Sequence, residues 1–274
     1  MASVERRRIV RYRDGAQAGP DQVAVEEPLV IEVDGRTVST TMRTPGSDIE
    51  LALGWLVSEG AITSIDDIVE AKECFEQVDD GDDVRRIVQV TTRSLPPIEP
   101  RLHTTSSACG LCGSDLIDLT SRTRQWPLEN DRTAFAPERL VEQPHLLREA
   151  QRGFDASGGL HAAGLFTTDG ELVCVREDVG RHNAVDKVVG WALQQGRLPL
   201  SGLCLQVSGR ASAELVHKAV VAGAPALAAV SAPTTLAVDL ARASGLTLVG
   251  FVREGSFNVY AGAERLGLDS GLDH

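Results

Sequence analysis

Residues 203–252, LCLQVSGRASAELVHKAVVAGAPALAAVSAPTTLAVDLARASGLTLVGFV, decide the fold of this chain. Short apolar runs without polar alternation predict strands that are covered on both faces, at 203–207, 226–230 and 246–252. Segments with apolar residues at helical spacing separate them, at 212–222 and 236–243. Strands that alternate with helices predict an α/β domain built on a largely covered, mixed sheet.

The same domain extends in both directions from this stretch. Upstream, the pattern predicts a helix at 137–152, a hairpin of 160–166 and 172–176 around Asp169-Gly170, and a helix at 183–195. Downstream, a short turn leads to a last strand at 257–260. We therefore assign residues 126–274 to one α/β domain.

The N-terminal part predicts a smaller α+β domain over residues 1–103. Residues 1 to about 20 are expected to form a mobile arm. The pattern then predicts a hairpin of 29–33 and 37–42 around Asp34-Gly35, a helix at 48–59 opened by a Ser47/Glu50 capping box, and a strand at 84–92. Residues 79–83 are expected to form a solvated hairpin turn, and residues 104–125 a flexible connection that contains a CxxC motif.

Composition excludes several classes of protein. The chain has 274 residues, with 39 acidic against 27 basic side chains and a formal net charge of -12, which disfavours nucleic acid as a partner. No apolar run follows the basic N-terminus, so no signal peptide is expected, and the Gly and Pro residues within 219–238 disfavour a bilayer span. These features predict a cytoplasmic protein without membrane contact. Nine acidic residues and one basic residue lie within 66–83, so the acidity is mostly local.

Two of the five cysteines form a motif, Ser106-Ser-Ala-Cys-Gly-Leu-Cys-Gly113. A pair such as Cys109 and Cys112 serves metal binding, disulfide exchange or sulfur relay, and it can also be incidental. A structural zinc needs four ligands, and a redox site of the thioredoxin type would open a helix inside a βαβ unit. Since neither condition is met, a sulfur relay fits best, and no structural metal is expected.

Three loops that follow predicted strands each carry one Gly and one Arg. They contain Gly180-Arg181, Gly209-Arg210 and Arg253 with Gly255. Ligands bind at the carboxyl ends of strands in open sheets, and helix N-termini favour anions. Each loop alone could be a solvated turn, but together the three predict a phosphate- or pyrophosphate-binding mouth.

His182 leaves several interpretations open. It could act as a general base, ligate a metal, or bond locally at the start of a helix. Asp186 and Lys187 are expected to make solvent or packing contacts. No GxSxG elbow accompanies Ser208-Gly209, which disfavours a serine hydrolase.

Taken together, several runs resemble one family, the formate dehydrogenase accessory sulfurtransferases (FdhD). The matching runs are MRTPG (42–46), ELALGWLVSEG (50–60), SSACGLCG (106–113), EDVGRHNAVDK (177–187), SGRAS (208–212) and GFVREGSFNVY (250–260). They span most of the chain in the expected order. Ala108 stands where many members have a third Ser.

The resemblance implies a function. Such proteins pass persulfide sulfur from a cysteine desulfurase to the molybdenum cofactor, bis-molybdopterin guanine dinucleotide, before the cofactor enters formate dehydrogenase. By this resemblance Cys109 carries the persulfide and Cys112 assists. Cofactor contact is implied for the late loop, Phe251, Val252, Arg253, Glu254, Gly255 and Ser256. The mouth residues are expected to bind the same ligand, namely Arg181, His182, Ser208, Gly209 and Arg210.

The resemblance also implies a fold and an assembly. The larger domain is expected to be a three-layer, cytidine-deaminase-like domain, in a homodimer. The zinc signature of the deaminases (HxE with PCxxC) is absent, so that likeness concerns architecture only. A non-catalytic chaperone of the molybdenum cofactor is the alternative function, and a zinc-dependent deaminase relative is a further one.

Overall fold

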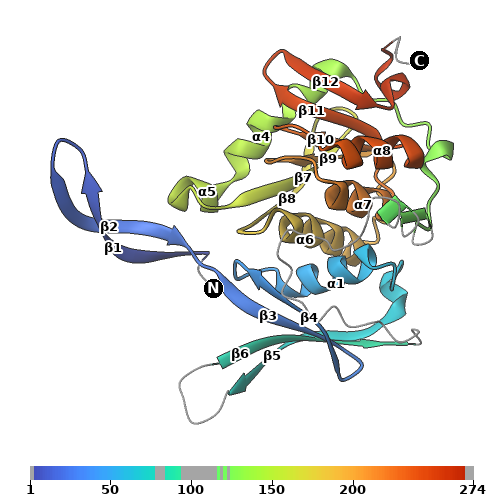
Figure 1. Cartoon of the computed structure of the whole chain (residues 1–274). Helices are drawn as coiled ribbons and strands as arrows, with labels where there is room; N and C mark the ends of the chain where they lie inside the picture. Colours follow the sequence, from blue (N-terminus) through green and yellow to red (C-terminus); the bar gives the residue numbers. More distant parts are fainter. Residues whose placement is uncertain (1–2, 78–83, 94–115, 118–119, 122–123, 269–274) are drawn as a thin grey trace.

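The computed structural model describes residues 3–77, 84–93, 116–117, 120–121 and 124–268 (Figure 1). Within these residues lie a six-stranded sheet, a four-stranded sheet and a two-stranded hairpin. No helix in the described ranges is long and apolar enough to cross a bilayer.

The six-stranded sheet has the order β12-β11-β10-β9-β7-β8. Its strands are β7 (His161–Thr167), β8 (Leu172–Asp178), β9 (Leu203–Val207), β10 (Ala226–Ala229), β11 (Thr247–Arg253) and β12 (Ser256–Ala261). Strands β9, β10 and β11 are parallel, β7 is antiparallel to both β9 and β8, and β12 is antiparallel to β11. The predicted mixed sheet is confirmed, and β8, β9, β10 and β11 all end at one edge, where β7 begins.

Both faces of this sheet are covered. On one face pack α6 (Arg181–Gln194), α7 (Ala213–Val221) and α8 (Thr235–Ser244), and on the other lies α4 (Gln143–Ala150). Alternate residues of β9 enter separate apolar clusters: Leu205 and Val207 belong to one, and Cys204 to the other. The helix–sheet–helix arrangement explains why these strands read as continuous apolar runs. The likeness to cytidine deaminases stays an expectation.

The predicted helix over 137–152 is wrong. The segment forms α3 (Pro137–Leu140) and α4, and α5 (Arg152–Ser157) follows. A continuous helix would place Pro144 in its interior, where the ring clashes with the preceding turn and no N–H is available. The chain breaks before it instead, so that Pro144 lies in the first turn of α4.

The four-stranded sheet has the order β4-β3-β6-β5. It comprises β3 (Glu27–Val33), β4 (Arg36–Arg43), β5 (Ile68–Gln77) and β6 (Val84–Thr92). The predicted hairpin is confirmed, since Asp34 and Gly35 both adopt positive φ, 49° and 76°, between β3 and β4. The predicted turn at 79–83 lies outside the described residues.

The predicted capping box of α1 (Asp48–Ser58) is wrong. Ser47 has φ 57°, a left-handed conformation, and its side chain caps no amide. Glu50 turns instead toward β8 and forms two bonds to Arg176, of 2.5 and 2.6 Å. Arg176, which is 126 positions away in the chain, thus binds the Glu50 carboxylate that a capping box would need.

The N-terminal arm is a hairpin of β1 (Val4–Tyr12) and β2 (Ala16–Ala24). We expected a mobile arm over residues 1 to about 20. The structure shows nine paired positions in it, from Val4↔Ala24 to Tyr12↔Ala16, and its mobility stays a prediction. The hairpin projects away from the rest of the molecule (Figure 1). Its base meets α5, and Gly159, just after that helix, lies close to Ala24.

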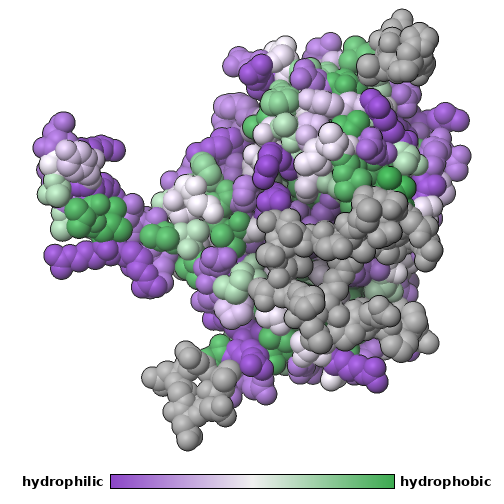
Figure 2. All heavy atoms as spheres, viewed as in Figure 1, coloured by the Kyte–Doolittle hydropathy of each residue, from purple (hydrophilic) through white to green (hydrophobic). Residues whose placement is uncertain are grey.

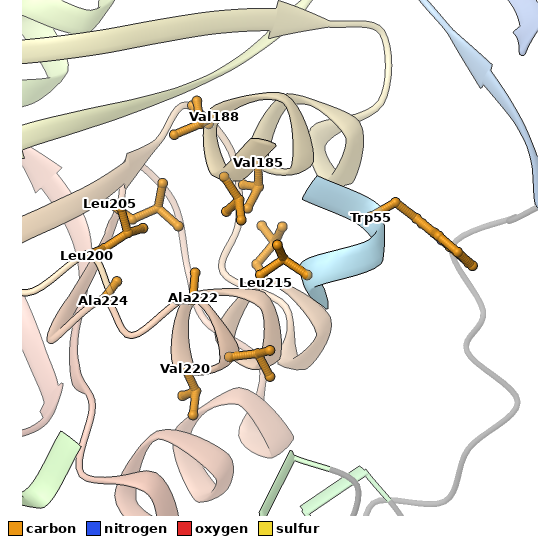
Figure 3. Close-up of a cluster of buried hydrophobic side chains, with 14 of the residues drawn as sticks. Trp55, Val185, Val188, Leu200, Leu205, Leu215, Val220, Ala222 and Ala224 are labelled. Carbon is orange, nitrogen blue, oxygen red and sulfur yellow. The ribbon is translucent and has the colours of Figure 1, made fainter. Parts of the chain in front are cut away.

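One apolar core joins the four-stranded sheet to the helices of the larger sheet. Side chains of α1, α6 and α7 meet in it, among them Trp55, Val185 and Leu215 (Figure 3). Helices α1 and α6 cross very closely. The division at residues 103 and 126 stays a prediction, because this core spans both parts.

Candidate functional site

The three Gly- and Arg-bearing loops meet at one edge of the six-stranded sheet. Backbone hydrogen bonds continue beyond the strand ends, from Ser231 N to Gly209 O and from Phe251 N to Ser231 O, both 3.2 Å. The loops after β9, β10 and β11 are therefore neighbours. The common edge expected for these loops is confirmed.

The loop after β8 positions Arg181 as the first residue of α6. Asp178 organises this loop: its Oδ1 accepts from Gly180 N at 2.8 Å, and its Oδ2 lies 2.7 Å from Lys187 Nζ. The Nε atom of Arg181 is buried and finds no hydrogen-bond partner in the described part of the chain. The positive charge of Arg181 opposes the dipole of α6, whose N-terminus is also positive. An anion bound here would interact favourably with the guanidinium and with the helix N-terminus.

His182 connects α6 to the start of α7. Its Nε2 lies 3.3 Å from Ser212 Oγ and 3.4 Å from Glu214 Oε2. Burial lowers the pKa of His182 to about 4, although the carboxylate of Glu214 acts in the opposite direction. The imidazole is thus neutral at physiological pH, and it interacts with its neighbours through hydrogen bonds and not as a cation.

Beneath His182 lies a small cavity of about 90 Å³ between β4, α1, α6 and α7. Polar groups line much of it, including Thr41, Asn183 and Glu59. Asp186 and Lys218 meet at its wall in a buried ion pair with Nζ–O distances of 2.7 and 2.9 Å. Although burial alone would lower the pKa of Lys218, the carboxylates of Asp186 and Glu214 raise it, so the ammonium stays charged.

Asp186 and Lys187 were expected to make solvent or packing contacts, and the expectation of solvent is wrong. Both are 2% exposed. Each pairs with an opposite charge that is distant in the sequence, Asp186 with Lys218 and Lys187 with Asp178. Neighbours on one helix therefore serve two different buried ion pairs.

The loop after β9 contributes Ser208, Gly209 and Arg210. Ser208 Oγ accepts from Ala162 N at 2.9 Å, which ties the loop to β7. Arg210 is exposed at the surface. A Cβ on Gly209 would lie 3.5 Å from His161 Nδ1, so this position leaves room beside the His161 ring.

Sequence reasoning missed His161. It begins β7, which runs antiparallel to β8 and β9 and thus starts at the edge where they end. Burial, and then the charge of Arg181, lower the pKa of His161. The predicted hairpin of 160–166 and 172–176 already places residue 161 at this edge, so the sequence could have indicated His161 as a site residue.

The late loop is the tip of the β11–β12 hairpin. Phe251 has φ 53° and is 39% exposed, a strained backbone for a large residue on the surface. Arg253 Nε donates to Ser256 Oγ at 3.2 Å across Glu254 and Gly255, which are exposed. The Val252 side chain is fully buried, so only its backbone is available for contact.

Cys109 and Cys112 lie outside the described residues. The first described residues after the motif include Leu116 and Thr120, which are 5% and 0% exposed. Thr120 Oγ1 lies 2.7 Å from His217 Nδ1, and His217 Nε2 lies 2.9 Å from Ser58 O. No cluster of three or more His, Cys, Asp or Glu residues suited to a metal occurs in the described ranges.

Comparisons with known proteins agree over nearly the whole chain. The model of the FdhD/NarQ family matches residues 24–267. The chain is similar to the sulfur carrier protein FdhD of Streptomyces coelicolor, with 54% identity over 271 residues, or 96% of both chains. The protein of that name from Nocardia farcinica is 50% identical over 262 residues, covering 95% of this chain and 94% of that protein.

A solved structure supports the fold. It is that of a candidate formate dehydrogenase accessory protein from Desulfotalea psychrophila, with a TM-score of 0.74. It covers 97% of this chain and 100% of its own, with 24% sequence identity. At this identity the likeness concerns the fold alone.

Proposed function

Because the chain belongs to the FdhD/NarQ family, we propose that it carries sulfur from a cysteine desulfurase to the molybdenum cofactor used by formate dehydrogenase. Relatives are named sulfur carrier proteins, and the solved structure of similar fold is described as that of a candidate formate dehydrogenase accessory protein. Cys109 holds the sulfur as a persulfide, and Cys112 assists. The protein thus acts as a sulfurtransferase.

One observation carries the cofactor half of this proposal, the unpartnered Nε of Arg181 at the start of α6. A buried guanidinium nitrogen without an acceptor is costly, because it has lost water and gained no hydrogen bond. A phosphate oxygen of the bound cofactor would supply the acceptor, and guanidinium suits phosphate well. The residues present therefore fit a ligand with a pyrophosphate.

The rest of the edge fits the same substrate. Bis-molybdopterin guanine dinucleotide carries two pyrophosphates. The exposed Arg210 follows β9 and the exposed Arg253 ends β11, at the edge of the sheet where Arg181 begins α6. Gly209 allows close approach of the ligand to the backbone. Phe251 presents an exposed ring, suited to stacking on a planar heterocycle.

The other cysteines are poor sulfur carriers. Burial raises the pKa of Cys174 to about 11 and that of Cys204 to about 12, so both stay thiols at neutral pH. Only a thiolate attacks a sulfur atom efficiently. Cys74 is half-buried, with its Sγ 3.2 Å from Gln89 Oε1. The burial of Cys174 and Cys204 supports the CxxC motif as the place for sulfur chemistry.

The loading step is a thiolate exchange. The Cys109 thiolate attacks the outer sulfur of the donor's persulfide, a new S–S bond forms, and the donor's own thiolate leaves. No net oxidation occurs. Cys112 precedes the buried Leu116 by four residues, and a chain of that length spans at most about 14 Å.

Intact mass measurement after incubation with a cysteine desulfurase and cysteine tests the sulfur half. The wild-type chain should gain one sulfur atom, and Cys109→Ser should gain none, whereas the control Cys74→Ser should load normally. Normal loading of Cys109→Ser would assign the sulfur elsewhere. Formate dehydrogenase activation by a chain with both Cys109 and Cys112 replaced would favour the non-catalytic chaperone instead.

A further inference from the structure

His161 lies at the edge of the candidate site with no partner for its ring. It is the first residue of β7 and pairs with Asp178 of β8 in the register, so the two side chains share the face of the sheet that α6 covers. Within the described part of the chain, no group forms a hydrogen bond or an ion pair with the His161 ring. The residue is only partly buried, so the ring stays accessible to a ligand.

Gly209 leaves one edge of this ring uncovered. A Cβ at this position would lie 3.5 Å from His161 Nδ1 and 3.7 Å from Cε1, which is an ordinary contact distance. Any other residue would therefore place a carbon atom against this edge of the ring. Because the residue is glycine, the space beside the nitrogen is left for an atom of a ligand.

Arg181 is the second anion-binding group at this place. Burial lowers the pKa of His161, and the charge of Arg181 lowers it further, so the guanidinium and the imidazole interact through space. The Nε atom of Arg181 is buried and has no hydrogen-bond partner among the residues that the structure describes. A phosphate oxygen between the two side chains would give each of them an acceptor.

The carboxylates of β8 are engaged with other groups. Asp178 favours the charged form of His161, but its Oδ2 already lies 2.7 Å from Lys187 Nζ. Glu177, the next residue on β8, accepts from two backbone amides at the start of α5, both at 2.8 Å. Neither carboxylate therefore pairs with the imidazole of His161.

The other elements around His161 also supply no such partner. Residues 158–160, which precede it, carry no charge. On α6 the neutral His182 follows Arg181, and its Nε2 lies 3.4 Å from Glu214 of α7. In the loop after β9 the charged residue is Arg210, which is exposed. In the free chain the His161 imidazole is therefore neutral at physiological pH.

We propose that His161 is a further anion-binding residue of this site, and that it takes up one proton from solvent when a phosphate group binds between its ring and Arg181. The proton adds to a ring nitrogen, the new N–H donates to a phosphate oxygen, and no other covalent bond forms or breaks. This inference rests on the cofactor half of the proposed function, because it names a further ligand of the same pyrophosphate. The negative charge beside the ring opposes the effect of Arg181 and favours the imidazolium.

Binding of the anion and protonation of His161 are then linked. Because the bound state holds one proton more, the affinity for the anion must rise as the pH falls, by at most about tenfold per pH unit. The rise is confined to the interval between the pKa of the free ring and that of the bound ring. Below that interval the free ring is itself protonated, and the affinity no longer changes.

Isothermal titration calorimetry of the full-length chain with diguanosine 5′,5′-pyrophosphate tests the proposal. Each phosphate of this probe is linked on two sides, so the probe lacks the second phosphate ionisation, which lies at about pH 6 in a monoester. Titrations in two buffers that differ in ionisation enthalpy give the number of protons taken up. The wild type should take up close to one proton per probe within the linked interval, and its dissociation constant should rise with pH.

His161→Gln keeps a hydrogen-bond donor but cannot take up the proton. It should bind the probe without proton uptake and with a dissociation constant that does not depend on pH. This constant should be near that of the wild type at about pH 8 and about tenfold higher than it at about pH 6. Equal affinity at the higher pH also shows that the variant folds. His145→Gln, whose side chain is 77% exposed on α4, is the matched control and should behave as the wild type does.

Nuclear magnetic resonance follows the same proton in the wild type, without a variant that has to fold. The ring resonance of His161, identified by backbone assignment, should titrate at a higher pH when the probe is bound. An unchanged titration midpoint would contradict the proposal.

A further control addresses binding of the probe elsewhere on the surface. Hydrophilic residues are spread over the surface seen in Figure 2, including the projecting arm, so an anion has other polar groups to contact. Arg6→Gln/Arg8→Gln removes two exposed arginines of that arm and should change neither the affinity nor the proton uptake. Arg181→Gln should weaken binding at every pH.

The outcomes separate this inference from the proposed function. Binding by the wild type without proton uptake, or uptake that persists in His161→Gln, would overturn the inference alone. Uptake that is lost only in His182→Gln would assign the proton to His182 and overturn it as well. No binding of the probe at any pH would overturn the cofactor half of the proposed function together with this inference, whereas sulfur loading of Cys109 tests the other half.

Discussion

Gly54 on α1 and Gly190 on α6 occupy the two points where these helices touch, each against the backbone of the other. A Cβ on Gly54 would overlap the carbonyl of Asp186, and a Cβ on Gly190 would overlap the carbonyl of Glu50. The four-stranded sheet is thus held to the larger sheet by a crossing that only glycine permits. Because α6 begins with Arg181 and His182, this crossing also positions the candidate site.

Replacing Gly190 by Ala should therefore destabilise the whole chain. The added methyl group meets backbone, which cannot rotate away, so we expect the free energy of unfolding to fall by about 2–3 kcal/mol. Denaturant titration measures this. Gly19→Ala is the control, since its Cβ would meet nothing closer than 3.9 Å. Equal stability of the two variants would show that the helices separate easily.

Removing the charge of Lys218 should cost more than removing the whole ion pair. Lys218→Met leaves Asp186 buried and uncompensated, and such losses amount to about 3–5 kcal/mol. The double variant Asp186→Leu/Lys218→Met removes both charges and should recover much of the loss. Thermal and denaturant unfolding of the three proteins measure the difference. A double variant that is less stable than Lys218→Met would contradict this account of the pair.

His182 should make the chain sensitive to acid. Its pKa in the folded chain is about 4, against 6.5 for the ordinary group, so only the unfolded chain binds this proton between those values. Stability should fall as the pH drops from 6.5 toward 4, by at most about 1.4 kcal/mol per pH unit. His182→Gln should show a shallower dependence in denaturant titrations across this window.

The matched control for this prediction is His145→Gln. The side chain of His145 is 77% exposed and lies on α4, away from α6. This variant should follow the wild-type dependence on pH. If the stability of His182→Gln depended on pH as that of the wild type does, other groups would cause the acid sensitivity.

Phe251 should lower the stability of the chain and yet be needed for sulfur delivery. Its φ of 53° is strained for a residue with a side chain, so Phe251→Gly should leave stability unchanged or raise it by up to about 1 kcal/mol. Loss of the exposed ring should nevertheless reduce sulfur delivery to the cofactor. Asp14→Gly relieves a similar φ of 53° in the arm turn and should leave delivery intact. Normal delivery by Phe251→Gly would remove Phe251 from the site.

Regularities within short segments made much of the larger sheet predictable. Strand β9 was predicted at its observed bounds, and the strand–helix alternation placed the loops of Arg181, Arg210 and Arg253 at one edge. The broken helix at Pro144 was also readable, since Pro cannot occupy a helix interior. The continuous helix over 137–152 is favoured by the apolar spacing alone, and the pyrrolidine ring of Pro144 rules it out.

Partners distant in the sequence explain what could not be predicted. Glu50 reads as a capping residue until Arg176 is known to lie beside it, and Asp186 reads as a solvated acid until Lys218 faces it. His161 joins the site only because β7 is antiparallel to β9. Such pairings arise from tertiary packing, which overrides local patterns.

The most direct test of the central claim follows one sulfur atom from protein to cofactor. The chain is loaded with radioactive sulfur by a desulfurase, freed of the donor, and mixed with bis-molybdopterin guanine dinucleotide. The label should leave the wild-type protein and appear in the cofactor fraction, whereas Arg181→Gln should load fully and retain most of its label. Label that stays on the wild-type protein, or that leaves both proteins equally, would contradict the account.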